Sequence, residues 1–173
     1  MRYTALLILV SALLNAGMMV AGRGGFIHTV AVLAAGIYVG LPALIMVGCG
    51  YLLGNRFSWA RQVMRIAVVV FVLSASFFIS LIPGRALVKH DIVAAKTYCE
   101  SLIPAIDKYR RQNGVYPLEI STVAQDKVVP RLLRSTRFYW SDGQTYRFNF
   151  GDPRGMMNFV GYNSLTLHWE EWH

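Results

Sequence analysis

The side chains best suited to metal chemistry lie in the last six residues of the chain. Residues 168–173 read His-Trp-Glu-Glu-Trp-His, and imidazole and carboxylate groups are both transition-metal ligands. On a strand, His168 and Glu170 point to one face, whereas Glu171 and His173 point to the other. Two ligands on one face could begin a metal site, but the pattern fits the polar end of an edge strand better. We therefore predict no metal and no cofactor.

No other group of residues forms a recognisable catalytic set. Asp91 follows His90, at a position where a carboxylate favours the start of a helix. Cys49 falls in an apolar stretch of the first half and Cys99 in a helical segment of the second half, so we expect no disulfide between them. The sequence contains no Ser-His-Asp or Cys-His-Asn arrangement and no glycine-rich phosphate loop. It therefore favours a non-enzymatic protein without catalytic residues; an enzyme would need Glu170 and the C-terminal histidines to converge on a bound metal.

The two halves of the chain differ sharply in their charged residues. Residues 1–87 carry six arginines, no lysine and no carboxylate, whereas all nine acidic residues lie between Asp91 and Glu171. From Lys89 onward, 11 basic residues accompany the nine acidic ones, so the formal net charge of +8 comes mainly from the first half. We read that charge as a signal of membrane topology and expect no nucleic-acid partner. The sequence predicts an anchor over residues 1–87 and a soluble domain over residues 88–173.

Three apolar stretches in the first half have the length of membrane spans, because about 20 apolar residues cross the hydrocarbon core. They cover residues 3–21, 26–53 and 63–83. Helices are the expected form, since an open sheet would leave backbone groups unpaired in lipid. The predicted fold is thus an α-helical membrane anchor of three transmembrane helices, in contact with membrane lipid, followed by a small α+β domain.

Positive charge on the short loops indicates the orientation of these helices. The loop between the second and third stretches, with its flank, carries three arginines, whereas the loop before it carries Arg23 alone. The three are Arg56, Arg61 and Arg65. This pattern predicts a cytoplasmic N-terminus and, in a bacterium, a multipass inner-membrane protein with a periplasmic C-terminal domain. Residues 1–22 could instead be a cleaved signal peptide, and cleavage would leave the orientation unchanged.

Small residues recur on the second apolar stretch at a spacing that lets helices pack closely. Gly36 and Gly40 form one Gly-x-x-x-Gly pair, and Gly50 and Gly54 form another. These glycines would contact either the other helices of the anchor or the helices of a partner, and we favour contacts inside the anchor. Pro42 lacks a backbone donor, so we expect a kink or a break near it.

The second half predicts a long helix before any strand. Apolar residues at helical spacing run over residues 90–113, and Gly114 suits the C-cap of that helix. Pro104 lies inside the run and should bend it, because the carbonyl of Glu100 loses its donor. A further short helix is expected over residues 119–127.

Strand patterns follow, beginning with a hairpin that turns at Asp142-Gly143. In the second strand of that hairpin, Tyr146, Phe148 and Phe150 alternate with polar residues and should face the core. The expected strands cover residues 137–140, 145–150, 157–162 and 165–172. The domain is then one long N-terminal helix packed on a small antiparallel sheet.

The junction between the helix and the sheet has a specific pattern, Tyr-x4-Gly-x-Tyr-Pro, at Tyr109, Gly114, Tyr116 and Pro117. Aromatic strand segments follow it. Together they resemble the globular half of type IV pilins and type II secretion pseudopilins, over roughly residues 90–170. The resemblance implies a pilin-like fold for about half of the chain.

Other features of that family are missing. Pilins begin with a single cleaved, membrane-inserted helix that bears a Gly-Phe processing site and a glutamate at the fifth mature position. Here Gly25-Phe26 is followed by Val30 at the position of the glutamate, and the dipeptide fits a turn between membrane helices. The calcium loop of the major pseudopilins is not recognisable either. The resemblance therefore implies a pilin-like domain fixed to the membrane, and it does not imply assembly into a pilus.

Protein recognition is the function class that these observations favour. Basic and aromatic residues of the second half are the candidates for contact with a partner: Arg131, Arg134, Arg137, Trp140, Arg147, Trp169 and Trp172. We predict that the domain docks a protein partner of the cell envelope, as an accessory of an envelope or secretion assembly. The alternative is an immunity protein whose partner is a toxin that acts at the membrane or in the periplasm.

Overall fold

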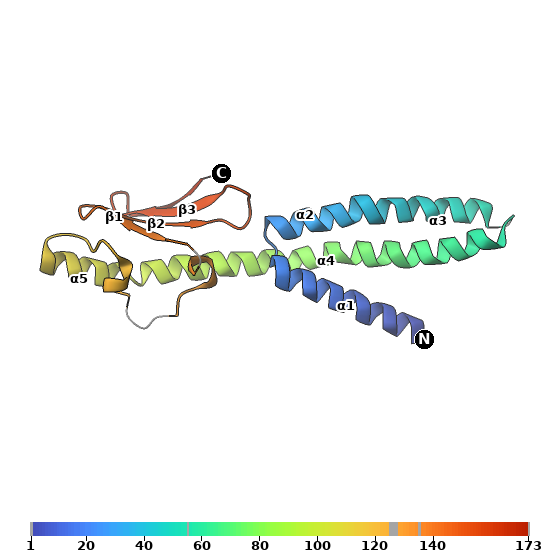
Figure 1. Cartoon of the computed structure of the whole chain (residues 1–173), viewed down its shortest axis with the longest axis horizontal. Helices are drawn as coiled ribbons and strands as arrows, with labels where there is room; N and C mark the ends of the chain where they lie inside the picture. Colours follow the sequence, from blue (N-terminus) through green and yellow to red (C-terminus); the bar gives the residue numbers. More distant parts are fainter. Residues whose placement is uncertain (1, 55, 125–127, 135, 173) are drawn as a thin grey trace. The chain divides into compact units, whose positions relative to one another are not determined.

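The structure, a computed structural model, describes residues 2–54, 56–124, 128–134 and 136–172. The chain divides into two compact units, Met1–Leu87 and Val88–His173. Figure 1 shows the helices and strands of both units. The boundary falls just before the first acidic residue, Asp91, so each unit has its own charge composition.

Unit 1 consists of helices. Helix α1 covers Arg2–Gly22, α2 covers Phe26–Ala35, a π-helical turn covers Gly36–Gly40, α3 covers Leu41–Leu53, and α4 begins at Ser58. Among the described residues, two helical stretches are long and apolar enough to cross a membrane, Phe26–Leu53 and Ser58–Asn113. The apolar part of α1, Leu6–Val20, is shorter. The third expected span, over α1, therefore stays a prediction.

The break expected near Pro42 takes the form of a local π-helical turn. Pro42 lies in the first turn of α3, where a missing backbone donor does little harm. The preceding turn, Gly36–Gly40, is wider than an α-helix, and the N–H of Leu41 bonds the carbonyl of Gly36. A π-helical turn contains one residue more than an α-helical turn, and the helix continues on both sides of it.

Helix α4 is a single helix over Ser58–Glu100 that continues through Pro83. It ends close to Pro104, as the missing donor of that proline predicts: α5 covers Ile103–Asn113 and has Pro104 in its first turn. Gly114 closes α5 in the left-handed conformation, with φ of 75°, as expected for a C-cap glycine.

The segment after α5 differs from the prediction of a helix over residues 119–127. Only the 3-10 turn Ile120–Thr122 forms among its described residues, and residues 125–127 lie outside the described part of the chain. Ile120 and Val123 pack against the aromatic core, which holds this segment down by side-chain contacts rather than by helical hydrogen bonds. A second 3-10 turn covers Arg131–Leu133.

Four antiparallel strands form a meander in the order β1-β2-β3-β4. They are β1 (Tyr139–Ser141), β2 (Tyr146–Gly151), β3 (Phe159–Asn163) and β4 (His168–Trp172). The predicted hairpin between β1 and β2 is confirmed, with Tyr139 opposite Phe148. Its turn is held by Asp142, whose carboxylate accepts hydrogen bonds from the N–H groups of Gln144 and Thr145.

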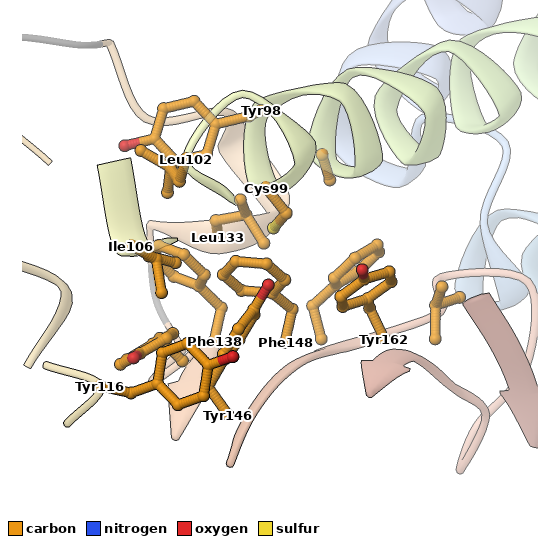
Figure 2. Close-up of a cluster of buried hydrophobic side chains, with 14 residues drawn as sticks. Tyr98, Cys99, Leu102, Ile106, Tyr116, Leu133, Phe138, Tyr146, Phe148 and Tyr162 are labelled. Atoms are coloured by element: carbon orange, nitrogen blue, oxygen red, sulfur yellow. The ribbon is translucent and has the colours of Figure 1, made fainter. Parts of the chain in front are cut away.

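The core of unit 2 is an aromatic cluster between the sheet and the α4–α5 helices. Tyr146, Phe148 and Phe150 all face it, as the alternation of β2 predicts, and each is at most 2% exposed. Figure 2 shows Leu102 and Ile106 approaching these rings from the helical side. This packing fixes one face of the sheet toward the helices and leaves the other face outward.

Candidate interaction surface

The outward face of the sheet follows from the two-residue repeat of its strands. On β2 the burial alternates without exception, so Arg147 and Asn149 point away from the core. Cross-strand pairing then extends the outward positions over all four strands. Trp140 is opposite Arg147, Arg147 is opposite Asn163, and Asn163 is opposite His168. We call these four residues the outer row.

The outer row combines an exposed aromatic ring with basic and polar groups. Trp140 is 48% exposed, and the structure gives the Arg147 side chain no ion pair among the described residues. His168 is partly engaged, because its Nε2 lies 3.5 Å from Oε1 of Glu170. An exposed tryptophan beside an arginine is a pairing typical of protein-binding hot spots. The row can thus bind an apolar or acidic group.

The other end of the outward face is aromatic. Phe159 on β3 is opposite Trp172 on β4, and about half of each side chain is exposed. The ring of Trp172 lies over Gly161, where a Cβ atom would come within 2.5 Å of the ring. A glycine at this position therefore lets the indole lie flat on the sheet. Phe159 was not among the predicted contact residues, although the alternation of its strand would have placed it outward.

Trp169, a predicted contact residue, belongs to the core. Its ring stacks on Phe148 with centroids 6.5 Å apart, and its Nε1 donates to a carboxylate oxygen of Glu100 at 2.8 Å. The ammonium group of Lys96 lies 5.5 Å from the ring centroid, within range of a cation–π interaction. Trp169 therefore joins the sheet to α4, and it is removed from the candidate surface.

Three of the predicted contact residues, Arg131, Arg134 and Arg137, make different contacts. Arg131 pairs with Asp91 at 3.7 Å, and Nε of Arg134 donates to the carbonyl of Val129. Arg137 is exposed and lines a hollow of about 310 Å³ together with Glu119. Of the four arginines predicted as contact residues, Arg137 and Arg147 have neither an ion pair nor a hydrogen bond to a backbone carbonyl among the described residues. Fewer arginines are therefore available to contact a partner than the sequence suggested.

A network of charges, which the sequence did not indicate, braces the end of the sheet near Phe159. Asp152 is 3% exposed and accepts hydrogen bonds from the backbone and side chain of Arg154. Arg154 also donates to Glu171 at 2.7 Å, and Lys96 donates to the other oxygen of Glu171. The hydrogen bonds from Arg154 and then Lys96 lower the pKa of Glu171. We call Asp152, Arg154, Glu171 and Lys96 the brace. The spacing Asp-x-Arg alone does not predict it, because the other two residues are distant in the sequence.

The described residues contain no arrangement suited to catalysis by a metal or a thiol. No group of three or more His, Cys, Asp or Glu residues among them could hold a metal ion, and His173 lies outside the described part of the chain. Burial, and then the nearby charge of Glu100, raise the pKa of the Cys99 thiol to about 12. A thiol with so high a pKa stays protonated near neutral pH and is a poor nucleophile.

The glycines of unit 1 pack against α4 of the same unit. A Cβ atom on Gly36 would meet the ring of Phe78, and one on Gly40 would contact Ser74. Gly50 faces Met64, and Gly54 faces the side chain of Arg61. These close approaches lie inside the chain, so the four glycines are not free to form an interface with a partner.

Unit 1 also has a buried polar centre that the sequence reasoning missed. His28 is 1% exposed; its Nδ1 accepts a hydrogen bond from the N–H of Gly24, and its Nε2 lies 2.9 Å from Oγ of Ser80. Ser80 in turn donates to the carbonyl of Phe77. Because Nδ1 is an acceptor, the ring proton of a neutral imidazole is on Nε2. Every polar atom of the ring is therefore satisfied, which is the mark of a structural histidine.

Among the described residues, the outward sheet face is the best candidate for a functional surface. Trp140 and Arg147 remain on it, while Trp172 lies at its aromatic end. Comparison with known proteins finds no matching family model, no similar curated protein and no similar solved structure.

Proposed function

We propose that this chain is a non-enzymatic protein of the bacterial inner membrane that recognises a protein partner through the outer row of its soluble unit. One observation carries the proposal. Trp140 and Arg147 are a cross-strand pair on the outward face of the sheet, where Trp140 is 48% exposed and Arg147 has no ion pair among the described residues. Exposed tryptophan and arginine residues contribute strongly to binding energy when a partner covers them.

The membrane part of the proposal rests on helix length, composition and loop charge. Two stretches, Phe26–Leu53 and Ser58–Asn113, have the length and apolarity of membrane spans. We propose that α1 is a third span, that the arginine-rich loop before α4 is cytoplasmic, and that unit 2 is periplasmic. In this arrangement the anchor keeps unit 2 at the membrane, where an envelope partner can reach it.

The proposal that unit 2 is pilin-like is supported by the order of its elements. A long helical segment, a cap at Gly114 and a loop through Tyr116 and Pro117 precede a four-stranded antiparallel meander. Two tyrosines hold that loop in place. Arg110 donates to the hydroxyl of Tyr116, and the hydroxyl of Tyr139 donates to the carbonyl of Pro117. A fold of this kind leaves activity open, so recognition is inferred from the surface.

Photocrosslinking in cells tests the proposal. A photoreactive amino acid replaces Arg147, in the outer row, and in a matched variant it replaces Arg111, an exposed arginine of α5. We expect one envelope protein to be captured from position 147 and not from position 111. Capture of a toxin from position 147 would assign the immunity function instead. Equal, unspecific capture at both positions would contradict recognition through the outer row.

A further inference from the structure

Four large apolar side chains are exposed at one end of the sheet of unit 2. Met156 and Met157 lie in the loop before β3 and are 80% and 79% exposed. Phe159 and Trp172, the cross-strand pair at the same end, are 46% and 50% exposed. We call these four residues the apolar tip. Four large apolar side chains exposed at one end of a small unit are typical of an interaction site.

The loop that carries the two methionines is held rigidly. The N–H of Asp152 bonds the carbonyl of Asn158, and the N–H of Gly155 bonds the carbonyl of Asp152. Arg154 clamps the buried carboxylate of Asp152 and reaches across to Glu171 on β4. The backbone is therefore closed into a tight loop whose polar groups turn inward, and the thioether side chains are left on the outside.

Contacts between β4 and α4 show at which end of unit 2 the tip lies. Trp169 bonds Glu100, whereas Glu171 bonds Lys96, which comes four residues earlier in the helix. The strand therefore runs antiparallel to α4, and Trp172 lies toward Val88, where the chain enters the unit. Lys96, which bonds Glu171, is eight residues beyond Val88. The level of Glu171 along α4 is therefore about 12 Å from the start of the unit, at 1.5 Å per residue.

We propose that the apolar tip inserts into the outer surface of the lipid bilayer in which the chain is anchored. This inference rests on the proposed membrane position of α4. The apolar run of α4 ends near Pro83, and the exposed cations Arg85 and Lys89 follow it, as expected for side chains at the level of the lipid headgroups. The tip lies at the end of unit 2 where the chain enters it from this apolar run.

The chemistry of the tip fits a lipid surface. The stretch 155–160 contains no charged residue. Asp152 and Glu171 are engaged with Arg154, and Glu170, on the same face as Trp172, lies 3.5 Å from Nε2 of His168. Indole rings favour the membrane interface because they combine an apolar body with a polar N–H group. Exposed methionine and phenylalanine side chains can enter the boundary between headgroups and acyl chains, while nearby cations attract anionic headgroups.

Labelling from the lipid tests the proposal on the full-length chain. The protein is reconstituted in nanodiscs of phosphatidylethanolamine and phosphatidylglycerol with a diazirine on the acyl chain, and the labelled residues are located by tandem mass spectrometry. We expect labels at Met156, Met157 or Phe159. Leu165 and Leu167, both 70% exposed in the turn at the opposite end of the sheet, are the control and should remain unlabelled.

Tryptophan quenching gives a second readout with matched variants. Trp172 and Trp140 lie on the same sheet face and are almost equally exposed, at 50% and 48%, but only Trp172 is in the tip. In nanodiscs of lipids brominated on the acyl chain, W172F should lower the quenched fraction of the emission, and W140F should leave the quenched amplitude unchanged. Phenylalanine keeps a ring over Gly161, so the fold is preserved.

The outcomes separate this inference from the proposal on which it rests. Labels within the apolar stretch 66–82 of α4 and none at the tip would overturn lipid insertion while supporting the membrane anchor. Labels in neither place would contradict the anchor itself. An equal effect of W172F and W140F would overturn the assignment of the tip, whatever the result in α4.

Discussion

The two units of this chain place their large apolar side chains in opposite ways. Unit 1 turns its large apolar residues outward, and its helices approach each other through glycine, alanine and serine. Unit 2 packs most of its aromatic residues into a core and carries most of its charged residues on the surface. In lipid, apolar side chains gain little from being buried against each other, so close backbone contact and internal hydrogen bonds must hold helices together. In water, burial of the rings supplies the stability.

Polar atoms show the same contrast. In unit 1 the few polar side chains bond each other or a carbonyl of the preceding turn, as in the contacts of Ser11 and Asn15 with Ser76. In unit 2 charged side chains form the network from Asp152 to Lys96 at the rim of the core. The comparison predicts that a substitution in one unit should lower the stability of that unit and leave the stability of the other unchanged.

The largest effect is expected from Phe148→Ala. Phe148 is 1% exposed and contacts five other aromatic rings, so its loss should lower the free energy of unfolding of unit 2 by about 3–5 kcal/mol. Near-ultraviolet circular dichroism during thermal unfolding measures the change. Phe159→Ala, on the outward face, is the control and should cost less than ~1 kcal/mol. A comparable loss in both variants would show that the sheet has no preferred core face.

In unit 1, His28→Ala should have the next largest effect. The substitution removes the acceptor for the N–H of Gly24 and the partner of Ser80, and a buried group left without a partner costs about 1–3 kcal/mol. Helix unfolding in mixed detergent micelles, followed by far-ultraviolet circular dichroism, measures the loss. Thr29→Ala, which removes only a local bond to Gly25, serves as the control. Loss of the near-ultraviolet signal of unit 2 in His28→Ala would mean that the two units do not unfold separately.

Close helix packing in unit 1 predicts a difference between two neighbouring glycines. A Cβ at Gly50 would lie 2.7 Å from Cβ of Met64, whereas nothing lies within 4 Å of one at Gly48. Gly50→Val should therefore destabilise unit 1 by about 1–2 kcal/mol through overpacking, and Gly48→Val should have little effect. The same detergent titration compares them. An equal loss in the two variants would contradict the packing of α3 against α4.

The smallest effect expected is a pH dependence from the brace. Its hydrogen bonds lower the pKa of Glu171 in the folded state, so its contribution to stability is present above the ordinary carboxyl pKa of about 4.3 and is lost as the pH falls through the lowered value. The melting temperature of unit 2 should thus fall slightly more between pH 7 and pH 3 in the wild type than in Glu171→Gln. Because Glu171 is largely exposed, solvent screening keeps the difference small. Parallel curves for the two proteins would exclude a stabilising role for the ion pairs of Glu171.

The periodic parts of the fold were predictable. The turn at Asp142-Gly143, the inward side of Tyr146 and the left-handed cap at Gly114 all follow from local patterns of a few residues. The short helix expected over residues 119–127 was wrong for its described part because contacts with the core, rather than local propensity, set that segment. Trp169 was a predicted contact residue but packs against the core. Both faces of β4 carry aromatic and charged residues, so alternation alone does not identify its inward face.

The sequence by itself determined the division into an arginine-only apolar half and a mixed-charge half, and it determined the order of the helices and strands. These features depend on composition and on local periodicity, which a single chain displays directly. Only the tertiary structure decided which side chains share a surface: it paired Trp140 with Arg147, brought Arg154 to Glu171, and placed Gly36, Gly40 and Gly50 against α4. Contacts between residues far apart in the chain depend on strand register and helix packing, and a linear pattern does not encode these locally.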